Sequence, residues 1–429
     1  MTGDPYYDQT WLDPEYIAKW NSGCWSFTKS FAAPAGQEGQ EVLLVLDGIK
    51  MGAMIELNGH HLGNASDQFI RYVFEVGHLL QRRNSSTMNE LNVTFGAELM
   101  IATDGRYTHS AQIDWAPGMS GAQIDPAGKA KKQPDMRYFG FGIWKSVYLV
   151  PLPAGSAAFS QLVVHPAYAG GHPTTMLTDE SHAGFDVTVR AELYAAAGVS
   201  TGTLTVLGGW PNAEAVSQQV KLTGGESVNN ITMKIPAAQT VGAALWHPHG
   251  HGKQALYNVT ATFTPHTQPA LTSRTWRRTG LRDVALVTVN DTDPRVAAAG
   301  GNGTGYLTMM FRVNGAPVYV RGANKIQMDL MDGRLSGEAH RRLVQSAVEG
   351  NFNMLRVWGQ GIWEPRAFHD ACDEMGVLLY SDSQIEPIYG TAQEQIELDY
   401  QIKRLSHHPS IVLWDGWCVV PTLISRPYL

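Results

Sequence analysis

The chain has 429 residues, of which 44% are hydrophobic and 17% are charged, and its net charge is −7. This composition is typical of an ordinary globular protein of about two to four domains, and it excludes a disordered or fibrous chain. The negative charge disfavours nucleic acid or an anionic membrane surface as a partner. No apolar run approaches the roughly 20 residues that span a bilayer.

Two features bear on the cellular compartment. The three cysteines, Cys24, Cys372 and Cys418, are too few for a disulfide framework and too far apart for a metal motif, and the first residues lack the apolar core of a secretion signal. Asn-X-Ser/Thr sequons are nevertheless more frequent than the roughly two expected by chance. They begin at Asn64, Asn84, Asn92, Asn230, Asn258, Asn290 and Asn302. The excess predicts a glycoprotein of the secretory route, lysosomal, vacuolar or extracellular; alternatively, β-rich loops simply favour these residue types.

Residues 1–152 alternate short strands with turns. Strands are predicted over 40–47, 53–57, 91–95 and 146–150, and Asn58-Gly59 is a dipeptide typical of tight hairpins. Many short strands without helices between them predict a β-sandwich. Residues 114–141 are rich in Gly, Pro and Lys and are predicted to form a surface loop.

Residues 151–155 are predicted to link this region to a second all-β region over 156–292. Its strands include 185–189 and 255–260, and its length suits an immunoglobulin-like sandwich. Another predicted linker, 297–303, precedes a change of pattern.

Strands and helices alternate over 304–429. The predicted strands are 317–322, 353–359, 377–382 and 410–416, with helices after Ser336, from about Pro365 to Gly376, and over 392–406. Four such units in succession predict a parallel sheet.

The parallel sheet could belong to a doubly wound fold or to a barrel. No glycine-rich phosphate loop follows the first strand, whereas Asn324, Trp358 and Asp382 lie just beyond strand ends, where a (β/α)8 barrel builds its active site. Because such a barrel needs about 250 residues, residues 304–429 are predicted to form its first half.

Five sequence landmarks, in order and spanning nearly the whole chain, resemble the β-mannosidases of glycoside hydrolase family 2. They are DWAP at 114–117 with GIWKSVYL at 142–149, LWHPHGHG at 245–252 with RTGLR at 278–282, RGAN at 321–324, LRVWGQGIWE at 355–364, and SHHPSIVLW at 406–414. The resemblance implies a jelly-roll-like sugar-binding-type domain at 1–152, an immunoglobulin-like sandwich at 156–292, and the N-terminal half of a TIM-barrel glycosidase domain at 304–429.

The resemblance also implies hydrolysis of terminal β-D-mannose from oligosaccharides, with retention and without a metal or other cofactor. Such a reaction needs two carboxyls about 5–5.5 Å apart. The family's acid/base Glu follows an Asn just after the fourth barrel strand, but here Trp417-Cys418 follows Gly416, and residues 416–429 contain no carboxylate. The strand of the nucleophile is also absent from the sequence. We therefore expect no catalytic residue in this chain, and expect it to be an incomplete, inactive piece.

Three alternatives remain open at this point. An exo-β-glucosaminidase shares the three-domain layout, a truncated isoform could bind carbohydrate without catalysis, and the chain could be an artefact of gene prediction.

Six residues are predicted to bind substrate. In the parallel-sheet region, Asp382 would lie near the sugar, Trp358 would stack on it, and Asn324 and Arg356 would donate or accept hydrogen bonds. The competing interpretations are a capping carboxylate for Asp382, a core tryptophan for Trp358 and a buried ion pair for Arg356. Asp114 and Trp115 would reach the site from an N-terminal loop, as the resemblance implies.

Some polar residues are not assigned a catalytic or metal-binding role. Lys325 stands where the family usually has Trp, and Ile113 stands where an aromatic residue is expected. Glu364 is interpreted as an acid that begins a helix, and Glu386 is not promoted to catalyst. The segment with His247, His249 and His251 is predicted to be an interdomain turn rather than a metal site.

Overall fold

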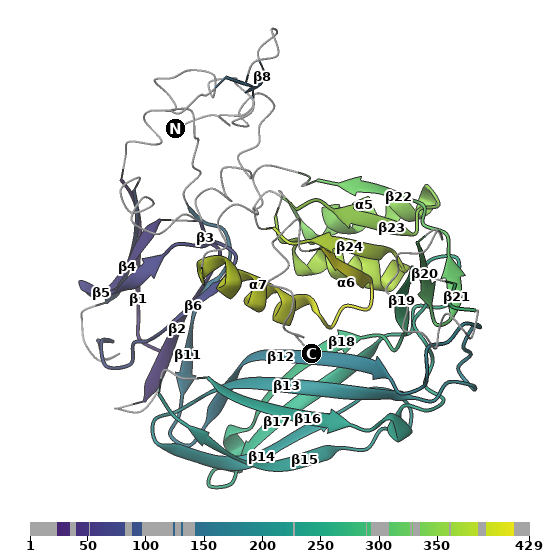
Figure 1. Cartoon of the computed structure of the whole chain (residues 1–429). Coiled ribbons are helices and arrows are strands. Elements are labelled where there is room, and N and C mark those ends of the chain that lie inside the picture. The colour runs from purple at the N-terminus through teal and green to yellow at the C-terminus, as the bar shows by residue number, and fades with distance from the viewer. Residues whose placement is uncertain are drawn as a thin grey trace.

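The computed structural model describes residues 24–34, 40–50, 52–81, 88–96, 123–124, 130–131, 142–225, 228–288, 290–292, 309–326, 328, 335–359, 362–384 and 392–415. Most regular structure in these residues is β-strand, and three α-helices lie toward the C-terminal end (Figure 1). None of the described helices is long and apolar enough to cross a membrane.

Two antiparallel sheets form the first unit. One has the order β1-β7-β4-β5 and the other β11-β2-β6. Their bounds are β1 Trp25–Phe31, β2 Glu41–Asp47, β4 Ala53–Leu57, β5 His60–Ala65, β6 Arg71–Glu75, β7 Asn89–Phe95 and β11 Val147–Leu152, with the short pair β3 Ile49–Lys50 and β10 Gly142–Ile143 beside them. Alternate residues such as Ile55 and Val93 are fully buried between the sheets.

The predicted hairpin is confirmed, because Asn58 and Gly59 have φ values of 52° and 79°, as a turn with two left-handed residues requires. Two sequence predictions are corrected. Residues 151–152 belong to β11, paired with β2, and are not a linker. The predicted loop 114–141 contains a short antiparallel pair, β8 Gln123–Ile124 with β9 Ala130–Lys131, and its other residues lie outside those described.

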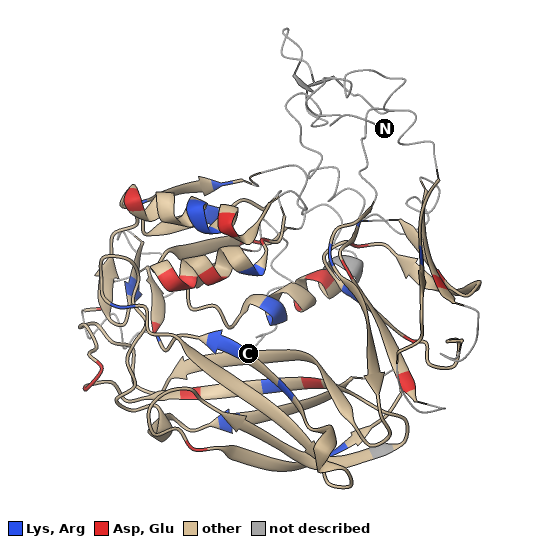
Figure 2. Cartoon of the chain, turned by 180° about the vertical axis from the view of Figure 1, so that it is seen from behind, with Lys and Arg blue, Asp and Glu red and all other residues tan. Residues whose placement is uncertain are grey.

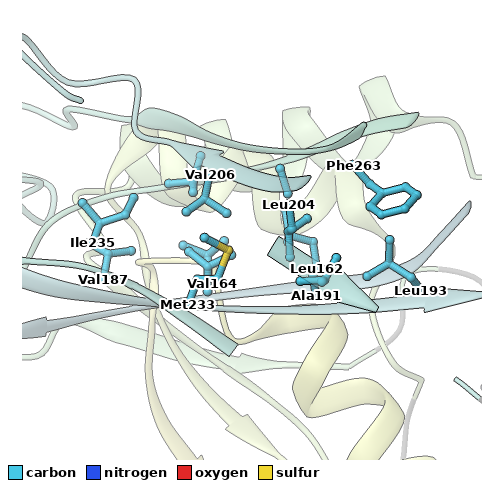
Figure 3. Packing of buried hydrophobic residues seen from close by; sticks show 14 of the residues in the cluster. Leu162, Val164, Val187, Ala191, Leu193, Leu204, Val206, Met233, Ile235 and Phe263 are labelled. Carbon is cyan, nitrogen blue, oxygen red and sulfur yellow. The ribbon is translucent and has the colours of Figure 1, made fainter. Parts of the chain in front are cut away.

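Two longer antiparallel sheets form the second unit, with the orders β12-β13-β16 and β15-β14-β17-β18. Their bounds are β12 Ala157–Tyr168, β13 Phe185–Ala195, β14 Val199–Leu207, β15 Val216–Thr223, β16 Asn229–Ile235, β17 Tyr257–Pro265 and β18 Ser273–Thr279. Figure 3 shows Val187, Met233 and Ile235 from one sheet facing Leu204 and Phe263 from the other. The unit is therefore a sandwich with one continuous apolar core.

The third unit begins with an antiparallel meander of β19 Val284–Val287, β20 Met310–Val313 and β21 Ala316–Val318. A parallel sheet follows, ordered β22 Gly322–Lys325, β23 Met354–Val357, β24 Leu378–Asp382 and β25 Ile411–Asp415. The helices between its strands are α5 Gly337–Glu349, α6 Arg366–Met375 and α7 Ala392–Leu405.

The predicted strand 317–322 is wrong in its position. The turn at Asn314 and Gly315, with φ values of 50° and 76°, folds β21 back onto β20 as an antiparallel partner. The first parallel strand starts only at Gly322, where a side chain would collide with the carbonyl of Met354 on β23. Asn324 therefore lies within a strand and not beyond its end.

The helix boundaries follow the predicted signals. The Ser336 side chain accepts a hydrogen bond from the Ala339 amide at the start of α5, and Gly376 ends α6 with φ 75°. Helices α5 and α6 cover one face of the parallel sheet, against Leu355 and Leu379. Charged residues gather on these helices, whereas the long strands of the second sandwich carry few (Figure 2).

The other face of the parallel sheet is divided along the strands. At the amino ends, Met354 and Leu378 pack against Phe311 and Val318 of the meander. The carboxyl ends of the same strands carry polar side chains on this face. The packing thus leaves the polar groups at one edge of the sheet.

Candidate functional site

Strand register brings the polar residues into two rows. Asn324, Arg356 and Tyr380 occupy paired positions on β22, β23 and β24, and Asp382 is paired with Asp415 on β25. Side chains at paired positions point to the same face, and positions two apart share that face. The five side chains therefore converge at the carboxyl ends of the strands, on the face opposite the helices.

An ion pair forms the centre of this cluster. The Arg356 guanidinium donates to both carboxylate oxygens of Asp382, at 3.1 Å from Nε and 2.6 Å from Nη2. The Gly359 amide also donates to Asp382, at 3.1 Å, and Arg356 Nη1 lies 3.4 Å from Asn324 Oδ1. Asp382 is fully buried, and this burial raises the pKa of its carboxyl, although Arg356 opposes the shift. The structure thus brings Asn324, Arg356 and Asp382 together.

Tyr380 and Asp415 belong to the same face and were not among the predicted residues. The Tyr380 hydroxyl donates to the Asp415 carboxylate, and this bond, together with burial, raises the pKa of Tyr380 to about 12. The Arg356 guanidinium lies 5.3 Å from the Tyr380 ring centre. The alternation of Tyr380 with Asp382, and of Leu413 with Asp415, is the sequence signal that places them on one face.

Trp358 is held beside this cluster through its backbone. Its amide donates to the Lys325 carbonyl at 3.0 Å, and its carbonyl accepts from Gln384 Nε2 at 3.1 Å. The side chain is half-buried. Its predicted stacking on a sugar stays a prediction.

Lys325 and Glu364 form a buried ion pair on the helix side of the sheet. The Lys325 ammonium donates to Glu364 Oε1, and it lies 5.0 Å from the Phe368 ring centre. His340 Nδ1 of α5 is 3.7 Å from Glu364 Oε2. The interpretation of Glu364 as a helix-starting acid is wrong, because α6 begins two residues later and the carboxylate is bound to Lys325.

Other predicted residues fall elsewhere. Asp114, Trp115 and Glu386 lie outside the described residues. The segment with His247, His249 and His251 leaves the second sandwich, and the His249 amide donates to the Gly376 carbonyl at 2.8 Å, so this segment contacts the end of α6.

One group of potential metal ligands occurs among the described residues, formed by Asp370, Asp373 and His408. Asp373 accepts hydrogen bonds from Ser410 Oγ and is bonded to His408 Nδ1, both at 2.6 Å. The ligand atoms are thus already used in contacts that hold β25 to α6.

Comparisons with known proteins agree with the sequence landmarks. Residues 1–133 match the family described as glycosyl hydrolase 2 galactose-binding domain-like. The β-mannosidase of Capra hircus is 29% identical over 431 residues, covering 96% of this chain and 45% of its own length. Beta-mannosidase A of Aspergillus aculeatus is 28% identical, covering 98% of this chain and 45% of its own.

The resemblance to the β-mannosidases of glycoside hydrolase family 2 is confirmed. This β-mannosidase-like chain spans about half the length of the curated relatives it matches.

Solved structures share the fold of this β-mannosidase-like chain. The β-D-mannosidase of Dictyoglomus thermophilum superposes with a TM-score of 0.70 at 24% identity, covering 96% of this chain and 47% of that one. The exo-chitosanase CsxA of Amycolatopsis orientalis has a TM-score of 0.64 at 18% identity, covering 96% and 43%. A β-glucuronidase of Bacteroides uniformis also has a TM-score of 0.64, at 19% identity, covering 95% and 41%.

Proposed function

We propose that this chain is the substrate-binding part of a β-mannosidase-type glycoside hydrolase, which in its full form removes terminal β-D-mannose with retention. The observation that carries the proposal is the convergence of Asn324, Arg356 and Asp382 at the carboxyl ends of the parallel strands. Asn324 is exposed and the Arg356 side chain is 30% exposed, so they offer acceptors and donors to sugar hydroxyls, while the buried Asp382 holds the guanidinium in place. Under this proposal Trp358 stacks on the ring, and Asp114 and Trp115 complete the site.

The proposal includes binding without turnover by the 429 residues themselves. Retaining hydrolysis requires one carboxyl as acid/base and another as nucleophile. Of the described carboxylates at the strand ends, Asp382 is bound by Arg356 and Asp415 accepts from Tyr380. Glu364 faces the helices, bound to Lys325.

The test measures binding and hydrolysis separately. We expect saturation-transfer NMR to detect binding of methyl β-D-mannoside to the purified chain. We expect no release of nitrophenol when the chain is incubated with nitrophenyl β-D-mannoside. Asp382→Asn should weaken the binding about tenfold, because Arg356 loses its charged partner. Asp186→Asn, on the second sandwich, is the matched control and should leave binding unchanged.

Two results would contradict the proposal. If the chain bound no neutral sugar, the proposed sugar site would be wrong. Enzymatic release of nitrophenol by the chain would refute the absence of catalytic carboxyls, and Glu364→Gln and Glu386→Gln would then show whether either residue is responsible.

An exo-β-glucosaminidase specificity is the second candidate, supported by the fold shared with the exo-chitosanase. Methyl β-D-glucosaminide, used as a competitor in the same NMR experiment, separates the two specificities. The third candidate is a carbohydrate-binding chain without any catalytic role, which predicts equal binding of several sugars.

We further propose a secretory, lysosomal or extracellular route, on the basis of the sequons. Within the described residues, Asn64, Asn230, Asn258 and Asn290 are exposed. Asn92 is half-buried, and its side chain is bonded to Thr28 at 3.2 Å and to Glu56 at 3.3 Å; Asn84 and Asn302 lie outside the described residues.

Peptide mapping of the chain from its native cells, before and after peptide N-glycosidase treatment, tests the route. We expect glycans at exposed sequons and none at Asn92, because its amide is engaged within the sheet. A chain with no glycan at any sequon would contradict the proposed route.

A further inference from the structure

The tryptophan that follows β23 lies beyond the end of its strand. Strand β23 ends at Val357, and Trp358 is followed in the sequence by Gly359-Gln360-Gly361. Glycine adopts many backbone conformations about equally well, so the residue types alone do not fix the backbone after Trp358. A fixed position of the Trp358 side chain must therefore come from contacts with other strands.

Three hydrogen bonds from the neighbouring strands hold the backbone around Trp358. Its amide donates to the Lys325 carbonyl of β22 at 3.0 Å. Its carbonyl accepts from Gln384 Nε2 at 3.1 Å, and the Gly359 amide of the same peptide unit donates to Asp382 Oδ2 at 3.1 Å. Both peptide units that flank the Trp358 α-carbon are thus held, which limits the rotamers that its side chain can adopt.

Gln384 connects this backbone to the buried carboxylate. Its Nε2 also donates to the Asp382 carbonyl, at 3.2 Å, so one side-chain amide joins the ends of β23 and β24. The Ser383 amide donates to the Asp415 carbonyl at 2.7 Å, which continues the pairing beyond β24. Gln384 is two positions after Asp382 and therefore lies on the same face of the sheet, the polar face.

The two contacts of Gln384 require a hydrogen-bond donor. The residue is fully buried, and its Nε2 faces two carbonyl oxygens, which can only accept. Its Oε1 has no hydrogen-bond partner in the described part of the chain. A methionine would fill nearly the same space and leave both carbonyls without this donor, so the amide nitrogen is the group that matters here.

We propose that Gln384 is a positioning residue of the sugar site, which holds Trp358 in the orientation that stacks on a pyranose ring. The assignment rests on the proposed sugar-binding function of the polar face. A side chain that must be ordered when the ligand binds lowers the affinity, whereas one that is held beforehand does not. Because Gln384 also bonds to Asp382, it fixes Trp358 relative to the ion pair of Arg356 and Asp382.

Fluorine NMR of the 429-residue chain labelled with 5-fluorotryptophan tests the proposal. The Trp358→Phe variant identifies the Trp358 resonance by its loss. In the parent chain we expect one narrow Trp358 resonance, which shifts when methyl β-D-mannoside is added.

In Gln384→Met this resonance should move and broaden before any sugar is added. Binding of the mannoside should weaken about tenfold, because the ring must then be ordered on binding. Gln384→Asn, whose amide is too short to reach both carbonyls, should show the same changes and provides a second variant.

Gln401→Met is the matched control. Gln401 of α7 is also fully buried and donates to a backbone carbonyl, that of Phe69 in the first sandwich. Its replacement should lower Tm, as the loss of a buried hydrogen bond does, and leave the Trp358 resonance and the mannoside affinity unchanged. A purely structural role of Gln384 predicts that its variants behave like this control.

The proposal is overturned if the Trp358 resonance of the two Gln384 variants keeps the position and width that it has in Gln401→Met. It is also overturned if the parent chain without sugar shows several Trp358 resonances, a result that does not depend on the Gln384 variants. A Trp358 resonance that depends on Gln384 but responds to no sugar would contradict the proposed function, and with it the role of Gln384 in sugar binding. The hold of Gln384 on Trp358 would then remain, so the two failures are distinguishable.

Discussion

At the scale of single residues, the buried ion pair with Lys325 gives the Glu364 carboxylate a structural role. Their side chains are 5% and 2% exposed, so each charge depends on the other for its stability inside the protein. The two residues are 39 positions apart along the chain, so the sequence does not reveal their pairing. An acid next to a parallel strand with polar residues at its end is therefore not by itself a candidate catalyst.

Removal of one member of this pair should be costly. We expect Glu364→Gln to lower the free energy of unfolding by about 3–5 kcal/mol, because it leaves the Lys325 ammonium buried without its carboxylate. The double variant Lys325→Met with Glu364→Gln should recover most of the loss. Urea unfolding followed by circular dichroism measures both.

The exposed pair of Lys234 and Asp186 is the control, with side chains 59% and 34% exposed. Asp186→Asn should cost less than about 1 kcal/mol. A loss for Glu364→Gln no larger than that of the control would mean that Lys325 does not depend on this partner.

At the scale of elements, local sequence signals predicted the helices well. The position of the first parallel strand depended on long-range pairing and was not predicted. Ser336 and Gly376 mark the ends of α5 and α6 through capping, which depends only on neighbouring residues. Strand β22 was misplaced, because Gly322, Ala323 and Asn324 have weak strand propensity and the strand exists only through pairing with β23.

Part of the candidate site was likewise predicted from the sequence, and part was missed. Asn324, Arg356 and Asp382 were predicted from landmarks at strand ends, and the parallel register brings their side chains together. Tyr380 and Asp415 were missed, because their contact requires the register of β24 with β25, which shifts at an irregularity next to Leu379. Such a shift has no signature in the residue types.

At the scale of the whole molecule, α7 connects all three units. Gln401 donates to the Phe69 carbonyl of the first sandwich, and Lys403 lies 2.8 Å from Glu192 of the second. Figure 1 shows α7 between the first sandwich and the other helices. Its last turn leads into the histidines that pack on α6, so these histidines lie where the units meet.

The buried histidines make the stability of this assembly dependent on pH. The pKa values of His369 and His407 lie well below 6.5, chiefly because burial disfavours the charged ring. Below about pH 6.5 the unfolded chain binds protons at both rings while the folded chain does not, so stability falls as pH falls. Each histidine should remove about 1 kcal/mol between pH 6.5 and 5.5.

Thermal unfolding across this pH range, in chloride buffer, should show a decreasing Tm, and His407→Gln should reduce the slope by removing one of the two rings. His60→Gln, which replaces an exposed histidine of β5, should leave the slope unchanged. A Tm that stays constant down to pH 5.5 would mean that the two rings take up protons in the folded state as readily as in the unfolded state.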